Sequence, residues 1–476
     1  MWIPRIEGRS GARYRAIADS LAEDVARSRL SAGTRLPTHR ALAEALGVTI
    51  GTISRAYAEA ERRGLVEATV GRGTFVKGGA DSPDGWGRTD AVGFPSMVPS
   101  QTPRDRQTAE PSLIDLSVNY PVGAYLGAAL APALAGMDEY ALLSEVANYQ
   151  PPSGREEHRA AGARWLQSLR LEADPEDMLV VPGVQGGLAV ALGALARPGD
   201  VLLTEAQSWP GLHYIAEQRQ LRLVPVASDG EGLRPDALEA AIRRHGARLL
   251  YCMPTLHNPT NITMPEARRR AIMAVAAAEG LTAIEDDIYG FLAEDAPPPL
   301  AAFDPEHAVY ITSLSKCVAP GLRIGYMKAP RAQIPRLSAA MRALTMMASS
   351  LSAEIASRLI RSGHAATAAR HQREAARRRQ ALAAEALRGL PVQTAPTSFH
   401  LWLPLEPPWD TARFVREALA QGVVVTPGDA FQVDPNTPQG VRLCLGAVAE
   451  EADLKTALER LTALLARHPQ TSLPVV

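Results

Sequence analysis

The chain has 476 residues, of which 46% are hydrophobic and 21% are charged, and its formal net charge is −1. These values exclude a disordered or collagen-like chain, and the length predicts two or three domains. The three cysteines, Cys252, Cys317 and Cys444, are far apart, which argues against a disulfide framework or a cysteine-based metal site.

The first 77 residues carry a mild excess of basic side chains. They contain 13 Lys and Arg against 8 Asp and Glu, a formal charge of +5 that leaves −6 for the rest. This asymmetry slightly favours nucleic acid as a partner, although many solvated surfaces have a similar surplus. No apolar run reaches the ~18 residues that span a bilayer, and residues 1–20 lack the apolar core of a signal peptide. We therefore expect a cytoplasmic protein with no membrane partner.

Residues 1–77 predict short helices followed by a hairpin. Gly47 permits a sharp reversal, and a helix is predicted from about Thr49 to Arg63 with one apolar and one polar face. The apolar face has Ile53, Tyr57 and Ala60, and the polar face has Thr52, Arg55, Glu59 and Arg62. The Gly-rich, β-prone stretch 65–76 follows. This order indicates a helix-turn-helix whose second helix is a candidate for entry into a DNA major groove.

The segments Gly33–Thr49, Gly64–Val66 and Gly71–Val76 closely resemble the GntR-type winged helix. The resemblance implies that five side chains face DNA, the last of them on the wing: Arg40, Thr49, Thr52, Arg55 and Arg72. Ile50 and Gly51 depart from the family pattern, because many relatives carry polar or basic residues there, and the base preference stays open. For any one of these residues the alternative is an ordinary solvated side chain.

The composition changes at residues 78–112, where Gly, Pro, Ser, Asp and Thr predominate and predict a flexible linker. From residue 113 onward, Ala-rich helical segments alternate with short apolar runs, the pattern of buried parallel strands joined by helical crossovers. The predicted strands are Met178–Val181, Val201–Leu203, Leu249–Cys252, Leu281–Ile284 and Ala308–Ile311. After about residue 329, long helices and short strands near His400–Leu403 and Val441–Leu445 indicate a smaller α+β part. The fold class is therefore α/β, with a mainly parallel sheet.

Lys316 lies next to Ser315 and shortly before a Pro-Gly turn, which suits a nucleophile that forms a Schiff base. A lone lysine is most often a surface residue, so the hypothesis depends on other segments that match a bound pyridoxal phosphate. The pyridine nitrogen of that cofactor needs a buried carboxylate to stay protonated. Asp286 directly follows an apolar strand and is our choice for this carboxylate.

Other needs of the cofactor are met elsewhere in the same region. Asn258 and Tyr289 can donate hydrogen bonds to the ring oxygen, and Trp209 can stack on the ring. The groups expected at the phosphate are the helix start Gly183–Gly187, Ser313 and Arg323. Taken singly, Trp209 or Tyr289 would more often be core packing, and Asn258–Pro259 would usually be a turn. Together the segments predict that this region binds pyridoxal 5'-phosphate.

In this order the segments resemble the fold-type I aminotransferases of the aspartate aminotransferase class, from about Ile114 onward. The resemblance implies that Lys316 forms the internal aldimine and that further residues hold the cofactor: Asp286, Asn258, Tyr289, Trp209, Val184, Gln185, Ser313, Arg323 and Tyr149. Tyr149 would reach the cofactor of a neighbouring subunit, so a homodimer is implied. Arg442 would grip the α-carboxylate of an amino acid, with a structural ion pair as its alternative. Val184 stands where relatives often place a hydroxyl residue, which removes one hydrogen bond to the phosphate.

A GntR-type winged helix, a linker and an aminotransferase-like domain resemble, in this order, the MocR family of regulators. The resemblance implies domains at 1–77 and 113–476, the second with a large part at about 160–330 and a small part made of 331–476 and 113–159. It also implies a homodimer, domain-swapped head to tail in one arrangement, that binds double-stranded operator DNA. The expected effector is a small amino compound or pyridoxal phosphate itself, and no metal is expected.

Two other functions stay open at this point. The first is a catalytically active aminotransferase with an accessory DNA-binding domain, because Lys316 and Arg442 complete the catalytic set. Its mark would be repeated turnover with a keto acid. The second is a regulator whose C-terminal domain only dimerises, and the intact Lys316, Asp286 and Arg323 argue against it. The effector, the target genes and the sign of regulation are not indicated by the residues.

Overall fold

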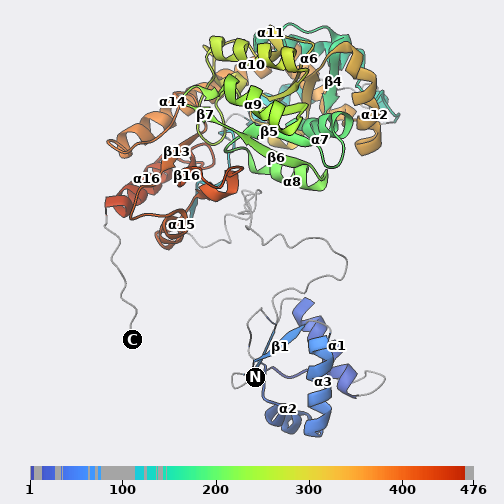
Figure 1. Cartoon of the computed structure of the whole chain (residues 1–476), viewed down its shortest axis with the longest axis vertical. Helices are drawn as coiled ribbons and strands as arrows, with labels where there is room; N and C mark the ends of the chain where they lie inside the picture. The colour runs from blue at the N-terminus through green and yellow to red at the C-terminus, as the bar shows by residue number, and fades with distance from the viewer. Residues whose placement is uncertain are drawn as a thin grey trace. The chain divides into compact units, whose positions relative to one another are not determined.

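The computed structural model describes residues 2–4, 13–26, 30, 34, 36–62, 65–69, 73–76, 113–122, 126–135, 137, 143–145 and 147–466. The chain separates into two compact units, residues 1–94 and 95–476 (Figure 1). Within the described ranges, no helix is both long enough and apolar enough to cross a membrane.

The N-terminal unit has three helices and a two-stranded hairpin. Its elements are α1 (Arg13–Ala26), α2 (His39–Leu46), α3 (Ile50–Arg62), β1 (Val66–Thr69) and β2 (Gly73–Val76). The two strands pair antiparallel. The apolar face predicted for α3 is confirmed, because Ile53, Tyr57 and Ala60 are buried in the core that this helix forms with α1 and α2. A helix-turn-helix followed by a hairpin is the winged helix that the sequence predicts.

Local sequence explains the corner between α2 and α3. The hydroxyl of Thr38 accepts a hydrogen bond from the amide of Ala41 at 3.3 Å and caps the start of α2. Gly47 ends α2 with a φ of +60°, a left-handed conformation that favours glycine. The hydroxyl of Thr49 then accepts from the amide of Thr52 at 3.2 Å at the start of α3. These contacts fix the turn that orients the first turn of α3.

A seven-stranded sheet forms the centre of the second unit. Its strands are β4 (Met178–Val181), β5 (Val201–Glu205), β6 (Arg222–Val226), β9 (Leu249–Cys252), β10 (Thr282–Asp286), β11 (Ala308–Ser313) and β12 (Gly325–Lys328). Their order is β4-β12-β11-β10-β9-β5-β6. The strands β11, β10, β9, β5 and β6 run parallel, and β12 is antiparallel to both of its neighbours. The five strands predicted from apolar runs are confirmed within a mainly parallel sheet.

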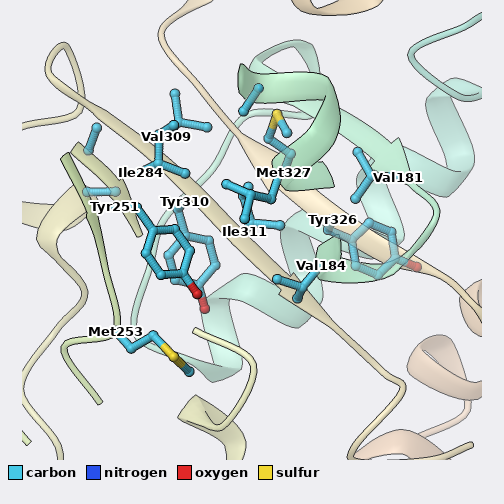
Figure 2. Packing of buried hydrophobic residues seen from close by; sticks show 14 of the residues in the cluster. Val181, Val184, Tyr251, Met253, Ile284, Val309, Tyr310, Ile311, Tyr326 and Met327 are labelled. Atoms are coloured by element: carbon cyan, nitrogen blue, oxygen red, sulfur yellow. The ribbon is translucent and has the colours of Figure 1, made fainter. Parts of the chain in front are cut away.

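Helices connect these strands and cover them. They are α4 (Leu126–Ala135), α6 (Glu156–Ser168), α7 (Gly183–Leu195), α8 (Pro210–Gln218), α9 (Pro235–His245), α10 (Glu266–Glu279), α11 (Leu300–Phe303), α12 (Ile334–Thr345), α13 (Ser350–Arg361), α14 (His364–Ala386), α15 (Thr411–Ala420) and α16 (Glu451–Ala466). Every residue of β4, β5, β9 and β11 is buried, which explains why these strands show no polar alternation. Figure 2 shows part of this core, with Ile284, Val309 and Ile311 among its members. A short hairpin, β7 (Ser228–Asp229) and β8 (Gly232–Leu233), precedes α9.

A smaller α+β part contains the strands predicted near residues 400 and 441. Strands β13 (His400–Pro404), β16 (Gly440–Cys444) and β15 (Thr426–Pro427) form an antiparallel sheet in the order β13-β16-β15. Helices α14 and α16 pack against each other beside it. The strand β3 (Ile114–Asp115) pairs in parallel with β14 (Val423–Val424). The residues directly after 113 therefore belong to this small part.

Candidate functional site

Four predicted site residues lie at one edge of the central sheet. Each lies on the connection that leaves one strand: Trp209 after β5, Asn258 after β9, Tyr289 after β10 and Lys316 after β11. These strands are parallel neighbours, so their carboxyl ends meet at the same edge. Ligands bind at this edge of open α/β sheets, because the connecting loops converge there. The topology therefore brings together residues that are far apart in the sequence.

Lys316 is half-buried just after β11. Its Nζ donates a hydrogen bond to the backbone oxygen of Asn119. Burial, together with the positive charges of Arg442 and Arg323, lowers the pKa of Lys316 to about 8. An amine with such a pKa has a larger unprotonated fraction near neutral pH than an ordinary lysine, which is what a nucleophilic lysine requires.

Asp286 ends β10 and is 3% exposed. Its Oδ2 accepts a hydrogen bond from the hydroxyl of Tyr251 at 2.8 Å, and its Oδ1 accepts one from the amide of Ile288 at 3.1 Å. Burial raises the pKa of Asp286 to about 7, although both hydrogen bonds act in the opposite direction. A protonated ring nitrogen beside this carboxyl would favour its ionised form, so the position suits the role predicted for it.

Asn258 and Arg442 contact each other. Nη1 of Arg442 donates to Oδ1 of Asn258 at 2.9 Å, and Nη2 donates to the backbone oxygen of Ser117 at 2.7 Å and to Oγ1 of Thr426 at 3.3 Å. The guanidinium carbon also lies 4.9 Å from the ring centre of Phe431. No described carboxylate pairs with Arg442, so the structural ion pair considered as its alternative is not found among these residues.

Tyr289 is buried and its hydroxyl accepts a hydrogen bond from Nδ2 of Asn119 at 2.7 Å. Its ring centre lies 5.7 Å from that of His400. Burial raises the pKa of Tyr289 above its usual value, so the phenol stays protonated. Because the oxygen accepts from Asn119, the hydroxyl proton can be donated to a ligand in the site.

The expected phosphate-binding groups converge at the start of α7. A β-carbon on Gly183, which has a φ of +72°, would lie 3.3 Å from Nη2 of Arg323. A β-carbon on Gly325 would lie 3.0 Å from Cβ of Ser313 and 3.2 Å from Cα of Gly183. The start of α7, Ser313 and Arg323 therefore lie close together, and a helix N-terminus, a hydroxyl and a guanidinium are groups that bind phosphate.

The remaining predicted residues are less closely connected to Lys316. Val184 is buried and Gln185 is exposed in the first turn of α7. Trp209 is half-buried and directly precedes α8. Tyr149 is 84% exposed, and no hydrogen bond or ring contact joins it to the other candidates in the described part of the chain. Such exposure is what a side chain directed at a neighbouring subunit would show.

Sequence reasoning misses Asn119 and Tyr251. Asn119 is 5% exposed and contacts Lys316, Tyr289 and His400, whose Nδ1 lies 2.9 Å from Nδ2 of Asn119. These partners are distant in sequence and the stretch around Asn119 has no periodicity, so no local signal identifies it. Tyr251 has the pattern of an ordinary core residue in a buried strand, and only the contact of its hydroxyl with a carboxylate distinguishes it.

Some residues near Lys316 have buried polar atoms that make no hydrogen bond to the described part of the protein. Among the described residues, these include Oδ1 of Asn119, Oγ of Ser315 and Nε of Arg442. Buried polar atoms nearly always make hydrogen bonds, so three such atoms in one site indicate a polar ligand. With the groups at the start of α7 and the carboxyl of Asp286, the residues fit pyridoxal phosphate.

Four of the five predicted DNA-facing residues are described. Arg40 on α2 and Arg55 on α3 are exposed. Thr49 is exposed, and its hydroxyl lies 2.9 Å from that of the half-buried Thr52. Arg72 lies outside the described residues. Exposed Arg and Thr side chains at a helix-turn-helix make this face a candidate DNA-binding surface.

Known proteins resemble each of the two units. Residues 111–461 match the family described as aminotransferase class I and II, and residues 13–76 match the bacterial regulatory proteins of the gntR family. The chain is 29% identical over 469 residues to the HTH-type transcriptional regulator YdeF of Bacillus subtilis (strain 168), which covers 98% of this chain and 96% of YdeF. It is 26% identical over 449 residues to the HTH-type transcriptional regulator YdcR of Escherichia coli (strain K12), covering 89% of this chain and 93% of YdcR.

The fold of the second unit is also found in solved structures. The crystal structure of an archaeal alanine:glyoxylate aminotransferase is 25% identical with a TM-score of 0.68, covering 76% of this chain and 93% of that one. Aminotransferases of this fold depend on pyridoxal phosphate. The chain thus belongs to the aminotransferase class I and II family and carries a GntR-family domain ahead of it, which is the domain order of the MocR-type transcriptional regulators.

Proposed function

We propose that this chain regulates transcription by binding operator DNA through its winged helix and by sensing pyridoxal phosphate, or an amino compound joined to it, at Lys316. The observation that carries the proposal is that Lys316 and Arg442 bond to the same short segment, through the backbone oxygens of Asn119 and Ser117. One site would therefore hold both a reactive amine and a group suited to bind a carboxylate. A domain that served only for dimerisation would need neither.

The environment of each group supports its proposed role. Bound pyridoxal phosphate supplies an electron sink for the bonds around an attached amine nitrogen. Lys316 would bind the cofactor covalently through Nζ, and its pKa of about 8 leaves part of it unprotonated at neutral pH. Asp286 would hold the proton on the ring nitrogen. Tyr289 and Nδ2 of Asn258 would donate to the ring oxygen, because Oδ1 of Asn258 is already bonded to Arg442.

Other residues would position the cofactor. Ser313, Arg323 and Gln185, with the amides at the start of α7, would bind the phosphate, and Trp209 would stack on the ring. Tyr149 would complete the site of a second subunit in a homodimer, and its exposure supports this role. A head-to-tail exchange of the winged helices between subunits is one arrangement of such a dimer.

Arg442 supports an effector that bears a carboxylate. Its Nε is buried without a partner in the described residues, so a ligand oxygen could satisfy it. An α-amino acid and a γ-amino acid both carry the required amine and carboxylate. Pyridoxal phosphate alone is the simpler effector, since it needs only Lys316.

The winged helix would bind two half-sites of double-stranded DNA in the dimer. Arg40, Thr49, Thr52 and Arg55 would contact phosphates or base edges from α2 and α3, and Arg72 would do so from the wing. Residues 78–112 would link this domain, at 1–77, to the sensing domain at 113–476. A DNA-binding role would place the protein in the cytoplasm.

Turnover as an aminotransferase is the second candidate function, favoured by the presence of Lys316 and Arg442 at the same segment. Lys316 would then serve as the general base and Arg442 would hold the substrate's carboxylate. The mark of this function is sustained production of a keto acid with a second keto acid as acceptor. A regulator would show exchange of the amine without sustained production.

The test is an absorbance titration with pyridoxal phosphate, followed by amino acids with and without a keto acid. Covalent binding gives a visible band, which we expect in the native protein and in the control Lys455→Ala, a surface change on α16. The band should vanish in Lys316→Ala. A band that persists in Lys316→Ala would refute the role of this lysine, and sustained keto acid production would place the enzyme function first.

A further inference from the structure

The covalent path from the winged helix to the cofactor site enters through residues 113–122, here called the entry segment. Its strand β3 pairs with β14, and the amide of Leu116 donates to the oxygen of Val424 at 2.8 Å. At its other end, Gln372 of α14 accepts from the amide of Val122 at 2.9 Å and donates to its oxygen at 3.0 Å. The entry segment is therefore fixed at both ends, and the Ser117–Asn119 stretch lies between them.

Lys316 bonds to the middle of the entry segment through the oxygen of Asn119. Condensation of Nζ with an aldehyde forms a C=N bond and releases water, which leaves the nitrogen with at most one of the three protons of an ammonium group. The charge-assisted bond to Asn119 is then weakened or lost. When an incoming amine takes over the C=N bond, Lys316 returns as a free amine and can bond to Asn119 again. The oxygen of Asn119 therefore responds to whether Lys316 itself is joined to the cofactor, and not to the carboxylate of the incoming amine.

Arg442 bonds to the same stretch through Ser117. A carboxylate bound in bidentate fashion uses two adjacent N–H groups of the guanidinium, and either such pair includes Nη2. Nη2 already donates to the oxygen of Ser117 at 2.7 Å and to Oγ1 of Thr426 at 3.3 Å. The hydroxyl of Thr426 itself donates to the oxygen of Ser117 at 2.7 Å. A bidentate carboxylate therefore replaces one contact of Nη2, either with the oxygen of Ser117 itself or with Thr426, whose hydroxyl is bonded to that oxygen.

We propose that the entry segment couples the ligand site to the winged helix. The contact of the Asn119 oxygen changes when Lys316 joins the cofactor, and the contacts of the Ser117 oxygen change when Arg442 binds the carboxylate of an amino compound. This inference rests on the proposed function. Each ligand shifts the segment only through the contacts that it replaces, so the cofactor and an amino acid have distinct effects. An amine without a carboxylate should leave the Ser117 contacts intact. Coupling between sites is typically about 5- to 150-fold in affinity and is reciprocal.

Hydrogen exchange of the full chain tests whether the ligands change the entry segment. Peptides covering residues 113–122 are followed with pyridoxal phosphate alone, then with added L-alanine or with ethylamine, its counterpart without the carboxylate. We expect several-fold faster exchange with the cofactor, a partial reversal when either amine releases Lys316, and a further change with alanine that ethylamine does not produce. Unchanged exchange in the presence of the visible band would overturn the coupling alone. Absence of the band would instead show that the proposed function itself has failed.

A spin-label distance between the two α3 helices of the dimer tests whether that change reaches the winged helices. Ser54 on α3 is exposed and the three native cysteines are buried, so Ser54→Cys can be labelled selectively. We expect the distance distribution to change with pyridoxal phosphate and again with alanine. An unchanged distribution in a protein that shows the band would overturn the coupling.

A matched pair of variants isolates the segment. Oδ1 of Asp115 accepts from the amide and the hydroxyl of Ser117 at 2.8 and 2.6 Å, so Asp115→Ala loosens Ser117. Oδ1 of Asp434 accepts from the amide and Nδ2 of Asn436 at 2.9 and 3.0 Å, the same arrangement outside the segment. In the Ser54→Cys background, Asp115→Ala should abolish the alanine-dependent change and keep the band, and Asp434→Ala should retain both. An equal response in the two variants would overturn the proposal.

Discussion

Replacing Tyr251 by Phe removes the hydroxyl that donates to Asp286 at 2.8 Å and keeps the ring in place. Tyr251 is fully buried and Asp286 is 3% exposed, so solvent cannot easily replace the lost donor. A hydrogen bond to a charged group contributes about 1.5–3 kcal/mol, and one pH unit of pKa corresponds to about 1.4 kcal/mol. The neutral carboxyl also accepts this bond, so only part of that energy shifts the pKa. We expect the pKa of Asp286, about 7 in the native chain, to rise by about one pH unit.

The change in stability should depend on pH. The folded-state pKa of Asp286 lies above its ordinary value of 3.8. The stability from its protonation is therefore complete below about pH 4 and is lost as the pH rises through the folded pKa. In Tyr251→Phe this loss continues beyond the native value of about 7. We expect the variant to be less stable than the native chain by about 1 kcal/mol at pH 5. At pH 9 we expect this difference to be larger by about 1.4 kcal/mol.

Urea denaturation of the cofactor-free full chain at pH 5 and pH 9 measures both values from the transition of the second unit. Tyr326→Phe is the control, because Tyr326 is fully buried in the same sheet and has no carboxylate partner among the described residues (Figure 2). Its effect should be the same at both pH values. If Tyr251→Phe also has equal effects at pH 5 and pH 9, the hydroxyl does not tune Asp286 and the reasoning is refuted.

Three further predictions concern other residues. Burial raises the pKa of Glu205 to about 7 from 4.5, so stability from its protonation is lost as the pH rises through that range. Glu205→Gln should therefore stabilise the second unit by about 3 kcal/mol at pH 8 and about 1 kcal/mol at pH 5 in urea titrations, and a pH-independent effect would contradict this. Arg55→Ala should weaken DNA binding and reduce the slope of log affinity against log salt by about 1, whereas an unchanged slope would exclude a phosphate contact. Ile53→Ala should cost the winged helix about 2–5 kcal/mol in thermal unfolding and leave the cofactor band unchanged, and loss of that band would show that the two units depend on each other.

Strongly patterned elements were predictable almost to the residue. The strands β4 and β9 have the predicted bounds, and each is a buried apolar run that begins directly after a charged residue. The strand β10 was predicted to end at Ile284 but continues through Glu285 and Asp286, which are both buried. Backbone pairing does not require an apolar side chain, so the ladder extends beyond the point where the hydrophobic signal stops.

Several candidate site residues were predictable for a related reason. Asp286, Tyr289 and Lys316 stand at the end of a buried strand or within three residues of it, where a polar residue is conspicuous. Asn119 has no such signal, although it contacts Lys316 and Tyr289 across 197 and 170 positions of the chain. Its importance arises from contacts that exist only after folding.

The sequence by itself determined that a winged helix precedes an α/β unit, because periodicity, glycine turns and apolar runs are local properties. It also determined which titratable and cationic groups are available to a cofactor. Only the tertiary structure decided how these groups are joined. The entry segment contacts both Lys316 and Arg442, and burial moves the pKa values of Lys316 and Asp286 to about 8 and about 7. Long-range contacts and desolvation depend on the whole fold, and no short stretch of sequence contains them.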